Sequence, residues 1–308
     1  MPRIWLGNVE EVFVPRGPGD DRILESKGST LAPRLLLYAE PGDAFVLSCG
    51  VAPEFGRYVQ EIAGLDEPPR VLFPSRLTSP YYLVDSTLED RRLMDELGAL
   101  VAGGDWSIEP QIETQRTWHL GDALGIPGGR TPRRDVSSGL VDRLNDKGRF
   151  KELAGQVGVP VVPGRCCSDD AAIRSAIDDL AREIPGDLML RKVLSGGGLA
   201  LECNLRHNGL SHILDFKRRY FGSAAAPAQV LYLENQRIGR DGVGLGELLE
   251  RLARVRLDGE PAIIRQPGRS GGLVVVVPPH GRRCGLALFG PDQESVTAMH
   301  RQVNAALT

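Results

Sequence analysis

The stretch "AFVLSCGVAPEFGRYVQEIAGLDEPPRVLFP", residues 44–74, decides the fold class of this chain. It opens with an apolar run that ends at Gly50, which predicts a short strand and a turn. Residues 53–65 carry apolar side chains at helical spacing, and residues 69–74 form a second short apolar run. A strand, a helix and a strand in this order predict an α/β fold with a parallel sheet. The apolar positions of the helix are Phe55, Tyr58, Val59 and Ile62.

The same alternation continues after this stretch. Residues 86–104 predict one long helix that ends at Gly103, and residues 125–139 are rich in Pro, Gly and Arg, which predicts a linker. We therefore expect a Rossmann-like N-terminal domain over residues 1–140. No Gly-x-Gly-x-x-Gly fingerprint occurs in it, which argues against a nicotinamide site. The apolar face of the long helix consists of Leu93, Met94, Leu97, Leu100 and Val101.

Beyond the linker, residues 145–158 predict a helix that Asn145 or Asp146 caps and Gly158 ends. Its apolar stripe is expected to include Val157. A second helix is expected over residues 168–186, with Ser168 as its cap. Two apolar strands around a Pro-Pro-His-Gly turn follow at residues 272–290, and a closing helix follows at residues 291–307. The closing helix should point Val296, Met299, Val303 and Leu307 inward.

Composition excludes several classes of protein. The chain has 308 residues, 42% of them hydrophobic, and a net charge of -3, which favours neither a nucleic acid nor a membrane surface as partner. No apolar run approaches the roughly 18 residues of a membrane span, and the first residues do not resemble a signal peptide. The five cysteines are odd in number and match no zinc spacing, so we expect reduced thiols and a cytoplasmic location.

Lysine is rare in this chain, so the positions of its five lysines are informative. Lys192 ends a predicted strand (residues 187–194) beside the glycine loop Ser195–Gly196–Gly197–Gly198. An ammonium group beside glycine-rich backbone can bind a polyphosphate, although a strand-end lysine can also simply reach solvent. Lys147 lies in the first turn of its helix, where it either binds phosphate or lies along the apolar stripe. We interpret Lys151 as structural.

The segment "LECNLRHNGLSH", residues 201–212, carries the most specific pattern. In a strand, Glu202, Asn204 and Arg206 share one face. The first two offer oxygen ligands suited to Mg²⁺, and the arginine can bind a carboxylate or a phosphate through its planar guanidinium group. The alternative is the solvent-exposed face of an edge strand, but Asn is depleted in strands. We expect His212 to be a surface histidine, or else to support the metal ligands.

Taken in order, these motifs resemble the ATP-grasp superfamily of carboxylate ligases. The segment "NDKGRFKELAGQVGVPVVPG" resembles the first lysine helix of that family, and "LMLRKVLSGGG" resembles its second lysine and phosphate loop. "ECNLR" is similar to its metal-binding Glu-x-Asn with an adjacent arginine. "NLRHNGLSH", "LAPRLLLYAEPGDAFVL" and "GPDQES" most resemble the branch with a pre-ATP-grasp domain, which includes the pheganomycin-type peptide ligases of peptide antibiotic biosynthesis.

The resemblance implies a role for each of these residues. Lys147 and Lys192 would bind the phosphates of ATP, and residues 195–198 would fold over the β- and γ-phosphates. Glu202 and Asn204 would hold Mg²⁺, and Arg206 would stabilise the acyl-phosphate or its transition state. ATP would phosphorylate a carboxylate substrate (an amino acid or a derivative), and an amine substrate (an amino acid or a peptide) would then attack. A homodimer is compatible with this reading.

One departure from the family stands out. Only Leu199, Ala200 and Leu201 separate Gly198 from Glu202, where the family has most of a subdomain, including an adenine-binding hinge and another acidic metal ligand. Either the nucleotide lid is lost or residues are omitted from the sequence. We favour omission, which predicts a break in the chain between Gly196 and Leu201.

We expect three units: the Rossmann-like domain, an ATP-grasp N-terminal subdomain at residues 141–198 and a metal-binding C-terminal subdomain at residues 199–308. The main alternative to a ligase is a non-catalytic ATP-grasp relative that binds a nucleotide or a partner as a scaffold. The Glu202, Asn204 and Arg206 row favours the enzyme, and the missing acidic ligand favours the scaffold. A ligase acting on an acyl-carrier protein would need a basic docking patch, which "RDVSSG" is too short to indicate.

Overall fold

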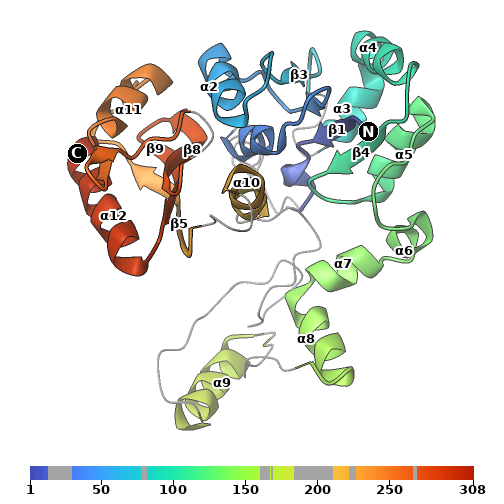
Figure 1. Cartoon of the computed structure of the whole chain (residues 1–308). Coiled ribbons are helices and arrows are strands. Elements are labelled where there is room, and N and C mark those ends of the chain that lie inside the picture. Colours follow the sequence, from blue (N-terminus) through green and yellow to red (C-terminus); the bar gives the residue numbers. More distant parts are fainter. Residues whose placement is uncertain are drawn as a thin grey trace.

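The structure is a computed structural model. It describes residues 1–12, 30–77, 82–159, 167, 169–183, 211–221, 227–265 and 269–308. Its N-terminal part contains a four-stranded parallel sheet in the order β3-β2-β1-β4 (Figure 1). The α/β prediction with a parallel sheet is therefore confirmed. The strands are β1 (Arg3–Leu6), β2 (Ala44–Val46), β3 (Arg70–Leu72) and β4 (Ser107–Pro110).

Side chains of β1 alternate between the two faces of this sheet. Ile4 and Leu6 pack into the core formed with α3, α4 and α5, whereas Trp5 packs into a second core with η2 and α2. The sheet is thus covered on both faces, as a parallel sheet requires. The elements around it are η1 (Val9–Val12), η2 (Ala32–Tyr38), α2 (Pro53–Ala63), α3 (Leu83–Glu89), α4 (Arg91–Val101) and α5 (Gln115–Leu124).

Two predicted helices of this part have different outcomes. The helix at residues 53–65 is confirmed as α2, with Phe55, Tyr58, Val59 and Ile62 buried. The prediction of one long helix over residues 86–104 is wrong, because the chain forms α3 and α4 with a break at Asp90. Asp90 has an extended backbone (φ -84°, ψ 95°), and its carboxylate accepts a hydrogen bond from the Leu93 N–H at 3.0 Å. This side chain caps α4 and ends α3.

Helices continue from the N-terminal sheet through the predicted linker (Figure 1). Within residues 125–139, which were predicted as a linker, the chain forms the short helix α6. Asp146 rather than Asn145 caps α8, since its carboxylate accepts hydrogen bonds from the N–H groups of Gly148 and Arg149. The helices are α6 (Arg133–Ser137), α7 (Leu140–Asn145), α8 (Lys147–Gln156) and α9 (Asp170–Glu183).

Two further details of these helices differ from the sequence prediction. Val157 is 75% exposed, so it does not belong to a buried stripe of α8. The Asp169 carboxylate accepts a hydrogen bond from the Ala172 N–H at 2.8 Å, which is the role expected of Ser168, a residue outside the described part. Gly158 ends α8 with a left-handed backbone (φ 74°), as predicted.

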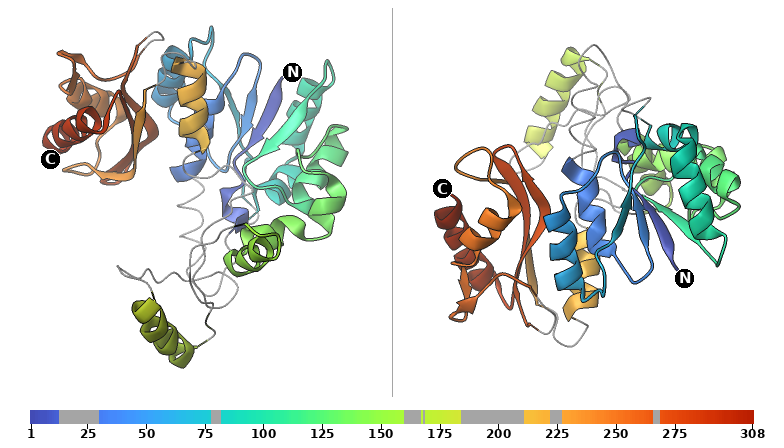
Figure 2. Two further views of the ribbon diagram at one scale, coloured as in Figure 1. Left: turned by 60° about the horizontal axis from the view of Figure 1, so that its bottom comes forward. Right: turned by 90° about the horizontal axis from the view of Figure 1, so that it is seen from above.

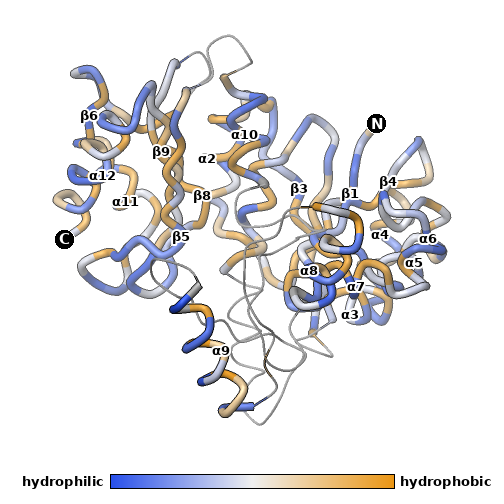
Figure 3. Tube along the Cα trace, turned by 90° about the horizontal axis from the view of Figure 1, so that it is seen from below, coloured by the Kyte–Doolittle hydropathy of each residue, from blue (hydrophilic) through white to orange (hydrophobic). Residues whose placement is uncertain are grey.

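The C-terminal part is an antiparallel sheet in the order β5-β9-β8, and its strands β8 and β9 are strongly apolar (Figure 3). Both strands and the closing helix are confirmed, and Val296, Met299, Val303 and Leu307 of α12 are buried. The elements are β5 (Gln229–Arg237), α11 (Leu245–Leu252), β6 (Arg256–Leu257), β7 (Glu260–Pro261), β8 (Gly272–His280), β9 (Arg283–Gly290) and α12 (Gln293–Leu307).

The C-terminal sheet packs directly against the N-terminal part. Figure 2 shows α11 and α12, the C-terminal sheet, the layer of α2 and α10 (Ser211–Phe221), and then the parallel sheet. Side chains from β8, β9, η2 and α2 share one hydrophobic core. The buried Arg34 of η2 also lies 3.2 Å from the Glu234 carboxylate of β5. The division at residues 140 and 198 stays a prediction, because residues 184–210 lie outside the described part.

Candidate functional site

The carboxyl ends of β1 and β4 form the point where the parallel sheet changes its direction of growth. The chain adds β2 and β3 on one side of β1 and then β4 on the other. In open parallel sheets the loops after such neighbouring strands diverge, and ligands bind in the crevice that they leave. We therefore built the candidate site from the residues that follow these two strands.

Asn8 ties the two loops together. Its amide nitrogen donates to the Ile112 carbonyl at 2.8 Å, and its amide oxygen accepts from the Ile112 N–H at 3.1 Å. Just before this pair, the Gln111 N–H donates to the Leu6 carbonyl at 2.8 Å. Asn8 and Gln111 are almost completely buried. The side chain of Asn8 thus replaces strand pairing beyond the last residues of β1 and β4.

Glu10 and Glu11 extend from η1 to the first turns of two helices. One carboxylate oxygen of Glu10 accepts a hydrogen bond of 3.0 Å from the Leu83 N–H, at the start of α3. One oxygen of Glu11 accepts a hydrogen bond of 2.8 Å from the hydroxyl group of Thr114, the residue that caps α5. Each carboxylate therefore lies at a helix N-terminus, where negative charge is favoured.

Glu10, Glu11 and Gln111 each have one side-chain oxygen that makes no hydrogen bond in the described part of the chain. Glu10 Oε2, Glu11 Oε1 and Gln111 Oε1 are buried oxygens without a hydrogen-bond partner there. Burial raises the pKa of Glu10 to about 8, with a further contribution from the nearby Glu11. Burial likewise raises the pKa of Glu11 to about 7, although the Thr114 hydroxyl group and the nearby Asn8 amide lower it in part. The Asn8 amide nitrogen donates to Ile112, so it does not complete the hydrogen bonding of Glu11. The negative charge of these two buried carboxylates is not balanced by a neighbouring cation in the described part. A bound proton or a bound cation can balance it.

Arg116 of α5 is the nearby cation, and it already has partners. Its Nε donates to the Asp85 carboxylate at 3.1 Å, and its guanidinium carbon lies 3.6 Å from the centre of the Tyr82 ring. Its charge lowers the pKa of Glu11 only as a minor contribution beside burial. Arg116 thus pairs with Asp85 and acts only weakly on Glu11, and no cation pairs with Glu10 in the described part.

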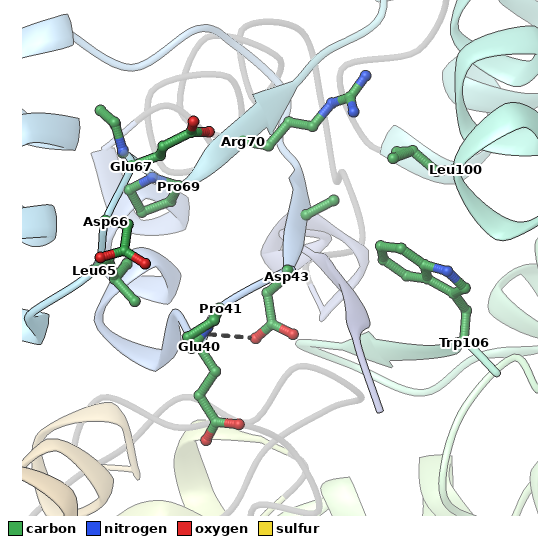
Figure 4. A pocket seen from close by; sticks show the side chains of 13 residues that line it. Glu40, Pro41, Asp43, Leu65, Asp66, Glu67, Pro69, Arg70, Leu100 and Trp106 are labelled. Carbon is green, nitrogen blue, oxygen red and sulfur yellow. Dashed lines mark hydrogen bonds between the residues drawn. The ribbon is translucent and has the colours of Figure 1, made fainter. Parts of the chain in front are cut away.

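A second hollow lies at the opposite, amino-terminal edge of the sheet (Figure 4). It has a volume of about 460 Å³ and is lined by acidic and proline residues, among them Glu40, Asp66 and Glu67, and by Trp106. The carboxylate of Asp43, which also lines it, accepts hydrogen bonds from the Trp5 indole N–H at 2.8 Å and from the backbone N–H of Arg3 at 2.9 Å. Asp43 thus serves to join β1 to β2.

The residues predicted to bind ATP and metal are largely outside the described part. Lys192, the glycine loop at residues 195–198, and the Glu202, Asn204 and Arg206 row all fall there, as does the expected chain break between Gly196 and Leu201. Lys147 is the first residue of α8, directly after its Asp146 cap. The structure therefore places the helix that carries the first lysine and leaves the remaining roles as predictions.

His212 is described, and its expected surface position is wrong. The residue is 1% exposed, and its ring packs edge-on against Tyr232 at 5.8 Å between ring centroids. It lies in the first turn of α10, which packs against η2. His212 lies on the face of α10 that also buries Ile213 and Phe216. A histidine by itself does not indicate whether its position is buried, so the sequence analysis missed this.

The sequence analysis did not identify Asn8, Glu10, Glu11 or Gln111. The available signal was a polar segment, "GNVEE", directly after the apolar strand "RIWL". Glu10 and Glu11 follow the end of β1 by a few residues, but adjacent carboxylates are also common in exposed loops, so the sequence alone did not distinguish them.

Comparison with known proteins adds the family of the N-terminal part. Residues 32–126 match the Pre ATP-grasp domain. The matched segment runs from η2 to the turn after α5 and lies within the predicted N-terminal domain. This domain is associated with ATP-grasp enzymes, so the resemblance to the branch with a pre-ATP-grasp domain is supported for this part of the chain. No curated protein matches the chain.

Two features are absent from the described residues. None of the helices there combines the length and apolar character that crossing a membrane requires. No group of three or more His, Cys, Asp or Glu side chains suited to a metal ion occurs in the same ranges. The predicted Mg²⁺ ligands, Glu202 and Asn204, lie outside these ranges. In the described part, Cys49, Cys167 and Cys284 are free thiols.

Proposed function

We propose that this protein is an ATP- and Mg²⁺-dependent carboxylate–amine ligase that forms a peptide or another amide bond. The observation that carries the proposal is the Pre ATP-grasp match at residues 32–126, followed in the chain by the ordered ATP-grasp-like motifs. A domain of this type upstream of a lysine helix, a glycine loop and a Glu-x-Asn-x-Arg row is hard to reconcile with unrelated chemistry.

The proposed reaction has two steps. Transfer of the γ-phosphoryl group of ATP to a substrate carboxylate gives an acyl phosphate and ADP. A neutral amine then attacks the acyl carbon, the new C–N bond forms, and the C–O bond breaks. The departing phosphate takes up the proton that the nitrogen loses. Positioning and charge stabilisation would provide most of the catalysis.

Each motif residue would have one role in this reaction. Lys147 and Lys192 would neutralise phosphate charge, and backbone N–H groups of residues 195–198 would donate to phosphate oxygens. Glu202 and Asn204 would hold Mg²⁺, which draws charge away from the transferred group. Arg206 would bind the acyl phosphate through its planar guanidinium group. The cap at Asp146 would orient the start of α8 and hence Lys147.

The test is amine-dependent ADP formation with panels of amino acids and short peptides as carboxylate and amine substrates. Glu202→Gln should abolish most ADP release, and excess Mg²⁺ should restore part of it, because the substitution removes the charge that holds the ion. Arg206→Lys should lower turnover more than ATP affinity, because its contact strengthens in the transition state. Glu250→Gln and Arg301→Lys are matched controls on exposed helix positions. Circular dichroism checks folding.

The non-catalytic scaffold is the second candidate, and one observation favours it: Gly198 and Glu202 are separated by three residues. A scaffold of this kind would bind nucleotide without amine-dependent ADP formation. Normal ADP formation in Glu202→Gln would instead show that Glu202, Asn204 and Arg206 are only the polar face of a strand. An intact mass greater than that of 308 residues would show that the chain is longer, as an intact nucleotide lid requires.

A further inference from the structure

We propose that the carboxyl edge of the N-terminal sheet, at Glu10, Glu11 and Gln111, binds the protonated amino group of an amine substrate. The site is argued from the structure alone. The proposed function enters only in making this amine a substrate of ligation, and the two claims can fail separately.

The hydrogen-bonding pattern fits a primary ammonium group. Three oxygens lack a partner in the described part, one each from Glu10, Glu11 and Gln111. Glu10 and Gln111 are each 1% exposed, so leaving these atoms unpaired carries the full cost of removing them from water. A primary ammonium group donates up to three hydrogen bonds and accepts none, which suits buried oxygens that lack a donor.

The charge balance also favours a cation. Arg116 is committed to Asp85 and to the Tyr82 ring, so Glu10 and Glu11 have no ion-pair partner in the described ranges. One oxygen of each carboxylate is fixed at a helix N-terminus by Leu83 N–H or Thr114 Oγ1. This arrangement orients the carboxylates in advance, which lowers the cost of ordering them around a ligand.

The position of the edge relates it to the proposed reaction centre. The Glu113 carboxylate, two residues beyond Gln111, accepts hydrogen bonds from the backbone N–H groups of Arg130 (2.6 Å) and Thr131 (3.0 Å). The chain then enters α6 and continues through α7 to α8, which begins at Lys147. Figure 1 shows these helices in succession below the N-terminal sheet. An amine held at this edge would thus lie on the side of the sheet from which the lysine helix departs.

A divalent metal fits this edge less well. Mg²⁺ and Ca²⁺ sites are built mainly from several carboxylates and carbonyls, and the described residues contain no group of three His, Cys, Asp or Glu side chains suited to a metal. The acidic hollow at the amino-terminal edge is also a poorer candidate, because both oxygens of Asp43 are already hydrogen-bonded to Trp5 and Arg3.

The test measures amine binding to the full-length protein without ATP. Glycinamide is the probe at a pH where its amine is protonated, and N-acetylglycinamide, which lacks the ammonium group, is the matched compound at equal ionic strength. Binding is followed by calorimetry and by the midpoint of thermal unfolding. Glu10→Gln and Glu11→Gln keep an acceptor for Leu83 N–H and Thr114 Oγ1 but cannot form a carboxylate that pairs with the ammonium group. Glu89→Gln, at an exposed position of α3, is the control.

We expect saturable binding of glycinamide and none of N-acetylglycinamide. Glu10→Gln and Glu11→Gln should each weaken binding at least about tenfold, as for other hydrogen bonds to charged groups, and Glu89→Gln should not. Equal effects of both compounds on the parent protein would overturn the site, and this comparison holds even if a variant fails to fold. Stabilisation by MgCl₂ alone, or by pH alone, would assign the edge to a metal or a shared proton instead.

These results are independent of the ligase assay. Glycinamide binding without any amine-dependent ADP formation would keep the site and reject the proposed function. Ligase activity with an unchanged KM for the amine in Glu10→Gln would keep the proposed function and reject the site.

Discussion

The hydroxyl oxygen of Tyr58 accepts a hydrogen bond of 3.1 Å from the backbone N–H of Val275, across the interface between α2 and β8. Tyr58 is 2% exposed, and burial raises the pKa of its hydroxyl group well above the ordinary value. A buried backbone N–H in β8 therefore depends on a side chain from the N-terminal part. This bond fixes how the antiparallel sheet sits on the layer of η2 and α2.

Tyr58→Phe should lower the stability of the whole protein. The substitution leaves the Val275 N–H buried without a partner, which costs about 1–3 kcal/mol. Urea unfolding followed by circular dichroism and by tryptophan fluorescence measures the loss. Because the two parts share one core, we expect the two probes to give a single, coincident transition. Unchanged stability, or separate transitions for the two probes, would show that this contact does not join them.

The raised pKa of Glu10 predicts a pH dependence of stability. In the protein without a bound cation its pKa is about 8, against an ordinary value of 4.5 in the unfolded chain, so between these values the folded state holds a proton that the unfolded state has lost. Stability should therefore fall as pH rises through this window, by at most about 1.4 kcal/mol per pH unit from one group.

Glu10→Gln should make that fall shallower, because an amide does not ionise and still accepts from Leu83 N–H. Glu11, whose pKa is raised to about 7, titrates in the same window and keeps part of the slope. Asp85 and Arg116 also lie close enough to act electrostatically on Glu11. Unfolding free energies of both proteins from pH 5 to pH 8 test this prediction. Parallel curves would mean that Glu10 is already ionised in the folded protein.

Two helical glycines should respond to alanine in opposite directions. A Cβ atom at Gly121 of α5 would lie 2.6 Å from the Ile126 carbonyl oxygen, which is too close without a shift of the backbone. A Cβ atom at Gly98 of α4 would meet nothing within 4 Å. Gly121→Ala should therefore destabilise the protein by about 1–3 kcal/mol. Gly98→Ala should stabilise it by about 0.5–1 kcal/mol, since alanine favours a helix.

Thermal unfolding of both variants measures this difference. Unchanged stability of Gly121→Ala would contradict the packing of α5 against the turn that follows it, and a destabilised Gly98→Ala would contradict the open space beside α4.

Strong periodicity explains which parts of the fold the sequence predicts. The stripes of α2 and α12 and the runs of β8 and β9 are regular, and each buries the residues expected. The break between α3 and α4 was missed because the apolar pattern continues across it. The deciding contact is local: the Asp90 side chain competes for the Leu93 N–H.

The candidate site at the carboxyl edge was harder to predict because it depends on pairing between distant residues. Asn8 and Ile112 are 104 residues apart, and only the strand order brings them together. The polar segment after β1 was visible, but its partners were not. The resemblance to ATP-grasp motifs predicts the chemistry of Lys192, Glu202, Asn204 and Arg206. These residues lie outside the described part, so their roles stay predictions.

Binding of MgATP by isothermal titration calorimetry, compared between the parent protein and Lys192→Ala, tests the central claim most directly. Lys217→Ala, in α10, is the matched lysine control. We expect the parent and the control to bind alike, and Lys192→Ala to bind about 10- to 150-fold more weakly, which corresponds to the ~1.5–3 kcal/mol of a charged hydrogen bond. Absence of MgATP binding by the parent, or equal affinity in Lys192→Ala, would contradict the account.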